Sequence, residues 1–330
     1  MPLIQFTDKG LYCPKGGFYI DPWAPVDKAV ITHAHSDHAR PGSAHYLCHT
    51  DTRPLLQLRL NADSIQVLPW GETISLNGIS ISLHPAGHII GSSQVCITDA
   101  HETWVVSGDY KTVDDGISGA FEPVPCQHFV TESTFGLPIY QWQPQAEIYS
   151  SIRQWITENQ AQGYNSVLLA YSLGKAQRVI EAIRYSFPLI YAHGAVANAQ
   201  ETLIAAGHAL QPVVRITPDT PRALLQKAVI IAPPSADGTP WLKKLQPYKL
   251  AICSGWMQVR GHQRRRNADA GFVLSDHADW KGLLAACRAT GAENIYVTHG
   301  FRSAFSRFLG EQGLNAIELQ TDFGKEDEEA

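Results

Sequence analysis

The chain has 330 residues, a net charge of −5 and 44% hydrophobic residues. This length allows about two domains with ordinary cores, and the negative charge argues against indiscriminate binding to nucleic acid. The six cysteines are widely spaced without a C-x-x-C pair, which favours reduced core residues over a disulfide framework. We find no signal peptide and no apolar run of membrane-spanning length. We therefore expect a cytoplasmic protein with no membrane association.

The first informative segment is 33–38, which reads His-Ala-His-Ser-Asp-His and follows an apolar run. If the segment begins extended, His33 and His35 project to the same side, because strand side chains alternate. Asp37 and His38 then follow around the bend. One metal does not easily take four ligands from six consecutive residues, so two neighbouring cations are expected. Imidazole and carboxylate suit zinc or manganese at a hydrolytic site, and a histidine-rich surface loop is the alternative.

Three more potential ligands each follow a strand-like hydrophobic run. They are His88 after 79–83, Asp109 after 103–107 and His299 after 294–298. Sheets place reactive groups on rigid supports at the ends of their strands. With segment 33–38 included, potential ligands follow four strand-like runs, which is hard to explain by chance.

Two further motifs lie between Asp109 and His299, and they enclose a different pattern. The motifs are Thr-Glu-Ser-Thr-Phe-Gly at 131–136, after the strand-like run 128–130, and Ser-Asp-His-Ala-Asp at 275–279, after 272–274. A helix is predicted to start near Gln145, and strand-like runs then alternate with helical segments at 167–170, 188–191, 228–231 and 250–253. This alternation is typical of a parallel α/β sheet with crossover helices.

Together these motifs resemble the metallo-β-lactamase superfamily, through H-x-H-x-D-H, G-H, G-D and a late histidine. The acidic motif, S-D-H-A-D and the long gap before His299 resemble its β-CASP branch, whose members cut nucleic acids. The resemblance covers nearly the whole chain, with the motifs in order. It implies an α/β fold: a metallo-β-lactamase αββα sandwich with an inserted parallel α/β β-CASP domain. The expected limits are 1–139 for the first part of the sandwich, 140–268 for the insert and 269–330 for the return.

The resemblance also implies a ligand set for two divalent metal ions, Zn or Mn. One ion would be held by His33, His35, His88 and Asp109, and the other by Asp37, His38, Asp109 and His299. Asp109 suits the shared position because its two oxygens can span cations about 3.5–4 Å apart. Asp21 matches the family's early aspartate, which supports the ligand loop. An acid that opens a turn before Pro22 is an equal alternative for this residue.

The predicted catalytic residues are His277, Glu132 and Asp37. A water activated between two cations can attack phosphorus, and the departing oxygen then needs a proton, for which His277 is the candidate general acid. Glu132 would hold that imidazole charged and oriented, since a nearby carboxylate raises the pKa of a histidine. An acid at a helix N-terminus is the alternative for Glu132.

Two stretches of the insert are candidate phosphate contacts. Ser172, Gly174 and Lys175 lie between a strand and a helix, where backbone N–H groups and the lysine could meet a phosphate, and the family carries a comparable G-[KR]-x-Q stretch. The missing first glycine of a P-loop argues against a nucleoside triphosphate. The second stretch places four arginines, Arg260 and Arg264 among them, near a tryptophan. This suits a single strand of nucleic acid, and a solvated basic loop is the alternative.

Three functions compete: a DNA nuclease, an RNA-processing nuclease of the same branch, and a scaffold that binds metal and nucleic acid without cutting. The presence of both Glu132 and His277 argues against the scaffold, and the long insert argues against a small-molecule lactamase or thioesterase. The residues alone do not separate DNA from RNA. Segments 6–14 and 254–257 most resemble the bacterial ligase-associated DNA exonucleases, which are encoded beside an ATP-dependent DNA ligase and a helicase. That resemblance implies a 5′ exonuclease on single-stranded DNA in DNA repair, functionally associated with both.

Overall fold

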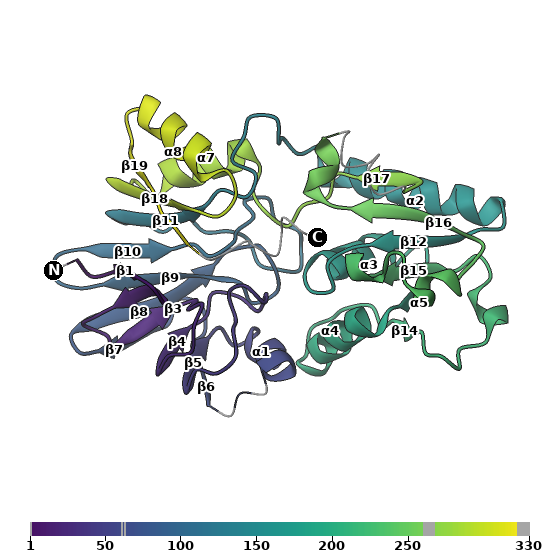
Figure 1. The fold of residues 1–330 in the computed structure, drawn as a ribbon, viewed down its shortest axis with the longest axis horizontal. Coiled ribbons are helices and arrows are strands. Elements are labelled where there is room, and N and C mark those ends of the chain that lie inside the picture. The colour runs from purple at the N-terminus through teal and green to yellow at the C-terminus, as the bar shows by residue number, and fades with distance from the viewer. Residues whose placement is uncertain (1, 61, 63, 260–267, 322–330) are drawn as a thin grey trace. The chain divides into compact units, whose positions relative to one another are not determined.

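The computed structural model describes residues 2–60, 62, 64–259 and 268–321. The chain forms two compact units, one from the residues up to Gln141 together with those from His277 onward, and the other from Trp142–Asp276 (Figure 1). Within the described residues no helix combines the length and apolar character needed to cross a membrane. All six cysteines are buried and free, as their spacing predicts.

The first unit contains two sheets. The strands of the first sheet, in spatial order, are β1 (Gln5–Thr7), β2 (Gly10–Cys13), β3 (Phe18–Ile20), β4 (Lys28–Val30), β5 (His45–Cys48) and β6 (Ile65–Val67). Those of the second are β19 (Asn315–Glu318), β18 (Asn294–Thr298), β11 (His128–Glu132), β10 (Thr103–Val106), β9 (Ser93–Thr98), β8 (Ile79–Pro85) and β7 (Thr73–Leu76). One apolar core joins them, with Ile20 and Val30 from the first sheet packed with Ile81 and Val106 from the second.

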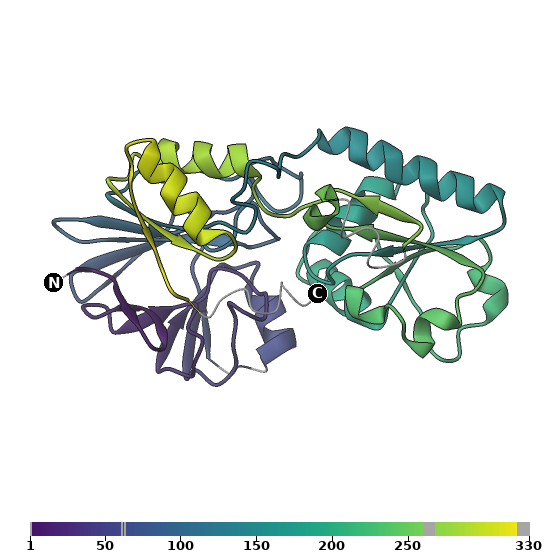
Figure 2. The same ribbon diagram turned by 45° about the horizontal axis from the view of Figure 1, so that its top comes forward.

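Helices α7 (Trp280–Ala289) and α8 (Arg302–Glu311) cover the outer face of the second sheet (Figure 2). Leu283 of α7 and Phe305 of α8 pack there with Val105 and Phe129. The central strands are therefore apolar on both faces, as strands with both faces covered must be. Helix α1 (Arg53–Leu60) follows β5 and buries Leu55 and Leu56. The expected α/β fold is confirmed.

Strand direction places the polar motifs at common edges. Strands β10, β11 and β18 run parallel as neighbours, so their carboxyl ends lie at one edge of the second sheet. Asp109, Glu132 and His299 stand at or just beyond these ends. In the first sheet β3 and β4 are also parallel, and Asp21 and His33 follow them. The runs 79–83, 103–107 and 294–298 are strands whose ends differ from prediction by at most two residues.

The second unit is built on one parallel sheet. Its spatial order is β14 (Val214–Arg215), β13 (Ile190–Ala192), β15 (Val229–Ala232), β12 (Asn165–Leu169), β16 (Tyr248–Cys253) and β17 (Ala270–Phe272). Helices α2 (Gln145–Ala161), α3 (Lys175–Ile183) and α4 (Gly194–Ala205) pack on one face. The other face carries α5 (Pro240–Lys243) and the short 3-10 helices η1 (Arg222–Leu225), η2 (Pro234–Ala236) and η3 (Gly255–Gln258).

The boundary between the units differs from the sequence-based limits. The expected return to the first unit at 269 falls at His277 in the structure. The reason is β17, which lies two residues before the predicted strand 272–274 and pairs in parallel with β16. These residues therefore extend the second unit's sheet. That this unit is a β-CASP domain stays a prediction.

Candidate metal centre

The ligand-rich segment turns at residues 36–38, where the bend is expected, but its start at 32–35 is bent and not extended. Strand β4 ends at Val30, and the residues that follow form bends and a turn. The Ala39 backbone N–H donates to the His35 carbonyl at 2.8 Å, which closes one helical turn. The His33 and His35 rings nevertheless lie close, with centroids 4.9 Å apart. The curled backbone brings the ligands together where a straight strand would spread them along its length.

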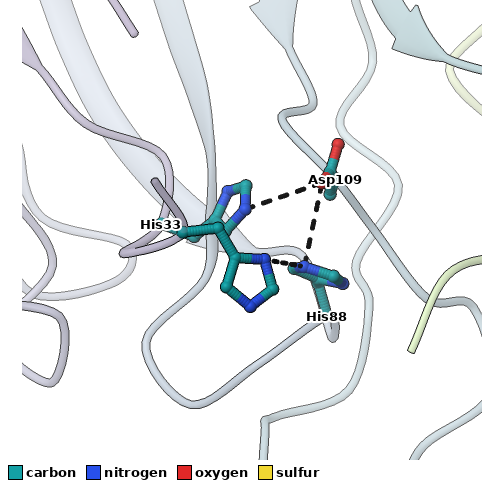
Figure 3. Close-up of side chains that lie close together, drawn as sticks. His33, His88 and Asp109 are labelled. Atoms are coloured by element: carbon teal, nitrogen blue, oxygen red, sulfur yellow. Dashed lines mark hydrogen bonds and ion pairs between the residues drawn. The ribbon is translucent and has the colours of Figure 1, made fainter. Parts of the chain in front are cut away.

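Four side chains form a first ligand group: His33, His35, His88 and Asp109, with one potential ligand atom of each within 4.8 Å of the others. Asp109 Oδ2 lies 3.6 Å from His33 Nε2 and 3.8 Å from His88 Nε2, and these side chains converge in Figure 3. His88 Nε2 lies 3.0 Å from His35 Nδ1. A tetrahedral zinc site with bonds of roughly 2.0–2.1 Å places its ligand atoms about 3.3–3.4 Å apart. The observed distances fit such a site.

Asp37, His38 and His299 form a second group by the same criterion. Asp109 Oδ1 lies 3.5 Å from His38 Nε2 and 3.9 Å from His299 Nε2. Asp109 therefore directs one oxygen at each group, which is the arrangement of a carboxylate that bridges two cations.

Two buried ligand atoms have no hydrogen-bond partner among the described residues: His33 Nε2 and Asp109 Oδ1. A buried polar atom without a partner costs roughly 1–3 kcal/mol. Cations held by the two groups would satisfy both atoms, and the imidazole and carboxylate donors suit zinc or manganese. The residues present thus fit two divalent ions.

The charges of the ligand side chains compensate one another. Burial raises the pKa of Asp109, and despite nearby His38 it reaches about 6. Burial lowers the pKa of His38, but Asp37, Asp109 and Asp21 outweigh burial and raise it to about 10. Burial and then the neighbouring histidines hold the pKa of His33 well below its usual value. His33 is therefore neutral, as a histidine that binds metal must be. His38 carries a proton that a bound cation would displace.

Beside the first ligand group, His277 contacts Glu132. His277 Nδ1 lies 2.9 Å from Glu132 Oε2 and 3.0 Å from Oε1, and the His277 and His88 rings are 4.6 Å apart. Burial raises the pKa of Glu132, but the His277 charge and hydrogen bonds outweigh it and the pKa ends below its usual value. Glu132 closes strand β11, so the alternative of a helix N-terminal acid is wrong.

Asp21 forms hydrogen bonds with residues of the ligand segment 32–38. Its Oδ1 accepts from the Thr32 backbone N–H at 2.8 Å, and its Oδ2 accepts from Thr32 Oγ1 at 2.5 Å. Asp21 Oδ2 also contacts His38 Nδ1 at 2.7 Å. Asp21 does stand at a turn after β3, with a φ of 42°. Its contacts are those of a residue that orients the ligand loop.

Sequence reasoning missed Ser133, in the middle of the Thr-Glu-Ser-Thr motif. Its hydroxyl donates to the His299 carbonyl, and its Oγ also lies 3.1 Å from the Thr298 carbonyl oxygen. It therefore holds the turn that presents His299, whose φ is 53°. Nothing in the sequence links a serine in this motif to a histidine so far along the chain.

The predicted phosphate contacts Ser172, Gly174 and Lys175 lie at the connection between strand β12 and helix α3, as the sequence predicts, and their role in binding phosphate stays a prediction. Lys175 is buried, and its Nζ lies 3.1 Å from Asp276 Oδ1 within the second unit. Gly174, also buried, donates its N–H to Gln177 Oε1 at 2.7 Å, while Ser172 is half-buried. A phosphate contact of Lys175 thus has to compete with an existing ion pair. Arg260 and Arg264 lie outside the described residues.

No family model matches the chain. It is 32% identical over 328 residues to a protein of Opitutus terrae named "Probable DNA ligase", covering 98% of this chain and 32% of that protein. It is 27% identical over 160 residues to "Endoribonuclease YSH1" of Eremothecium gossypii, covering 48% and 20%. Arabidopsis thaliana "Cleavage and polyadenylation specificity factor subunit 3-I" is 25% identical over 199 residues, with 49% and 28% covered. The matches thus span a third or less of these relatives' lengths.

Among solved structures, a protein of unknown function from Enterococcus faecalis V583 has a similar fold. Its TM-score is 0.60 at 13% identity, with 90% of this chain and 80% of that chain covered. This likeness concerns the fold alone.

Proposed function

We propose that this chain is a metal-dependent phosphodiesterase that hydrolyses nucleic acid at a binuclear centre. The observation that carries the proposal is the placement of Asp109, with one oxygen toward each ligand group. A site for a single structural ion has no need of such a residue, since one ion is satisfied by four ligands.

The side chains around the centre have different roles in the hydrolysis. When bound, two cations supply Lewis acidity toward phosphoryl oxygens and lower the pKa of water. Asp37 stays ionised beside them: burial raises its pKa, but the charges of His38 and His299 hold it well below the usual value. Glu132 fixes the His277 ring by accepting from Nδ1–H. His277 Nε2 is then the atom that delivers a proton to the departing oxygen.

DNA is the substrate we propose, with digestion of single strands from the 5′ end in DNA repair. The support is the relative named as a DNA ligase, which matches along 98% of this chain, together with the resemblance to ligase-associated exonucleases. A functional association with an ATP-dependent DNA ligase and a helicase follows from the same resemblance. RNA is the second candidate. The relatives named endoribonucleases favour it, but they match only about half of the chain or less.

The test compares single-stranded DNA and RNA of identical sequence, each labelled at either end and supplied with manganese or zinc. The proposal predicts metal-dependent ladders from DNA that shorten from the 5′ terminus, faster with a 5′-phosphate than with a 5′-hydroxyl. Cleavage of RNA alone would transfer the assignment to the second candidate. Cleavage of neither strand by the metal-loaded protein would leave a non-catalytic scaffold.

A further inference from the structure

We propose that Thr32 and Thr298 are positioning residues that fix the tautomer of one histidine ligand in each metal group. The inference rests on the proposed binuclear centre. Each threonine directly precedes its histidine, so the sequence contains the pair Thr-His twice, at 32–33 and 298–299. Both threonines are buried, and their hydroxyl hydrogens are committed elsewhere.

Thr32 serves the first group. Its Oγ1 donates to Asp21 Oδ2 at 2.5 Å. The same Oγ1 lies 3.1 Å from His33 Nδ1. Because a hydroxyl has one hydrogen, the second contact must run from His33 Nδ1–H to Oγ1. A neutral His33 then has its lone pair on Nε2, the atom that faces Asp109 at 3.6 Å.

Thr298 repeats this logic in the second group. Its Oγ1 donates to the Thr131 backbone carbonyl at 3.2 Å, and a carbonyl only accepts. Oγ1 also lies 3.0 Å from His299 Nδ1, so Nδ1 must carry the hydrogen. His299 Nε2, 3.9 Å from Asp109 Oδ1, is left as the metal-binding atom. The two acceptors, a carboxylate and a carbonyl, are different, but each forces the same direction on the hydrogen bond.

The packing around Thr32 leaves it little freedom. Gly108, directly before Asp109, has a φ of 56°, and a Cβ there would lie 2.6 Å from Thr32 Oγ1 and 2.7 Å from Thr32 Cβ. The glycine of the G-D motif therefore makes room for Thr32. The hydroxyl is bound by Asp21, and any side chain at residue 108 would collide with it, so it offers His33 an acceptor in a fixed position.

The test uses Thr32→Val and Thr298→Val, which keep the side-chain shape and remove the hydroxyl. Thr32→Ser and Thr298→Ser keep the hydroxyl and serve as matched controls. Competition between protein and a chromophoric chelator for zinc gives the two binding constants. We expect each valine variant to weaken one binding step by about 10–100-fold, the usual effect of losing a partner of a metal-bound histidine, and the double variant to weaken both. The serine variants should bind as wild type does.

Imidazole nitrogen shifts of the metal-free, histidine-labelled protein report the tautomers directly. The expected result is the Nδ1–H form at His33 and His299 in wild type, and its loss at the affected ring in each valine variant. A thermal melt of every metal-free variant separates a folding defect from a binding defect. Valine variants that melt and bind zinc as wild type does would overturn the inference while leaving the binuclear centre intact. A wild type that binds fewer than two ions would overturn the proposed function, and this inference with it.

Discussion

Asp109 is the side chain on which both ligand groups depend, because its two oxygens face different groups. Asp109→Ala should therefore lower the content of both ions, whereas His88→Ala should lower mainly that of the first group. Elemental analysis of dialysed, zinc-reloaded protein measures this. His101→Ala, which changes an exposed histidine, is the control. An Asp109→Ala protein that keeps two ions per chain contradicts the bridging role.

Substitution of His277 tests proton transfer separately from metal binding, and Glu132 is the partner that orients this histidine. Neither belongs to the two proposed ligand groups, although Asp109, Glu132 and His277 also offer ligand atoms within 4.8 Å of one another. His277→Ala should leave zinc content nearly intact and lower turnover by roughly 10²–10⁴-fold, the usual contribution of a general acid. Single-turnover cleavage of labelled DNA under saturating metal checks it. Equal rates for variant and wild type would remove His277 from the mechanism.

At the scale of elements, the turn after β18 presents His299 under steric constraint. Gly300 has a φ of 59°, and a Cβ there would meet the Ser133 carbonyl oxygen and Thr134 Cα at 2.4 Å. Gly300→Ala should lower both the melting temperature and zinc affinity, because the turn must move and carries His299 with it. Gly291→Ala is the matched control, since Gly291 has a φ of 65° and open space around its Cβ position.

The control should show only the strain of a left-handed alanine, about 1–2 kcal/mol. Equal losses of stability in the two alanine variants, with zinc affinity unchanged in both, would mean that the contact with Ser133 does not position His299.

Helix α3 begins at Lys175, whose side chain is buried. Lys175 and Asp276 form a buried ion pair, and removing one partner of such a pair typically costs roughly 3–5 kcal/mol. Lys175→Ala should therefore destabilise the protein strongly, as chemical denaturation can measure, while Lys227→Ala at an exposed lysine should not. A Lys175→Ala protein that keeps wild-type stability and loses only its preference for 5′-phosphorylated ends would restore the phosphate contact expected from the sequence.

These elements also show what could be predicted from the sequence. The ends of strands could be predicted, because apolar runs stop shortly before a polar ligand, as at His299 and Asp109. The bent backbone at 32–35 could not be predicted, since alternation of side chains assumes an extended backbone. The partner of Lys175 was equally hidden, because a lysine at a helix start looks the same whether it meets a phosphate or a buried aspartate from a distant segment. The sequence-based limits assign β17 to the wrong unit, because an apolar run does not reveal which sheet it joins.

For the whole molecule, the first unit contains every residue of the proposed centre, although the chain leaves it at Gln141 and returns at His277. The ligands come from both sheets of this unit, so the centre forms only when the two sheets pack against each other. Metal binding should then be coupled to the folding of this unit, as it is for other sites assembled from distant segments.

In the proposed centre, two cations lie on either side of Asp109. Crystals grown with manganese, with anomalous diffraction recorded at the manganese absorption edge, test it directly. We expect two anomalous peaks about 3.5–4 Å apart, both in contact with Asp109. One should lie beside His33, His35 and His88, and the other beside Asp37, His38 and His299. A single peak, or two peaks away from these side chains, would contradict it.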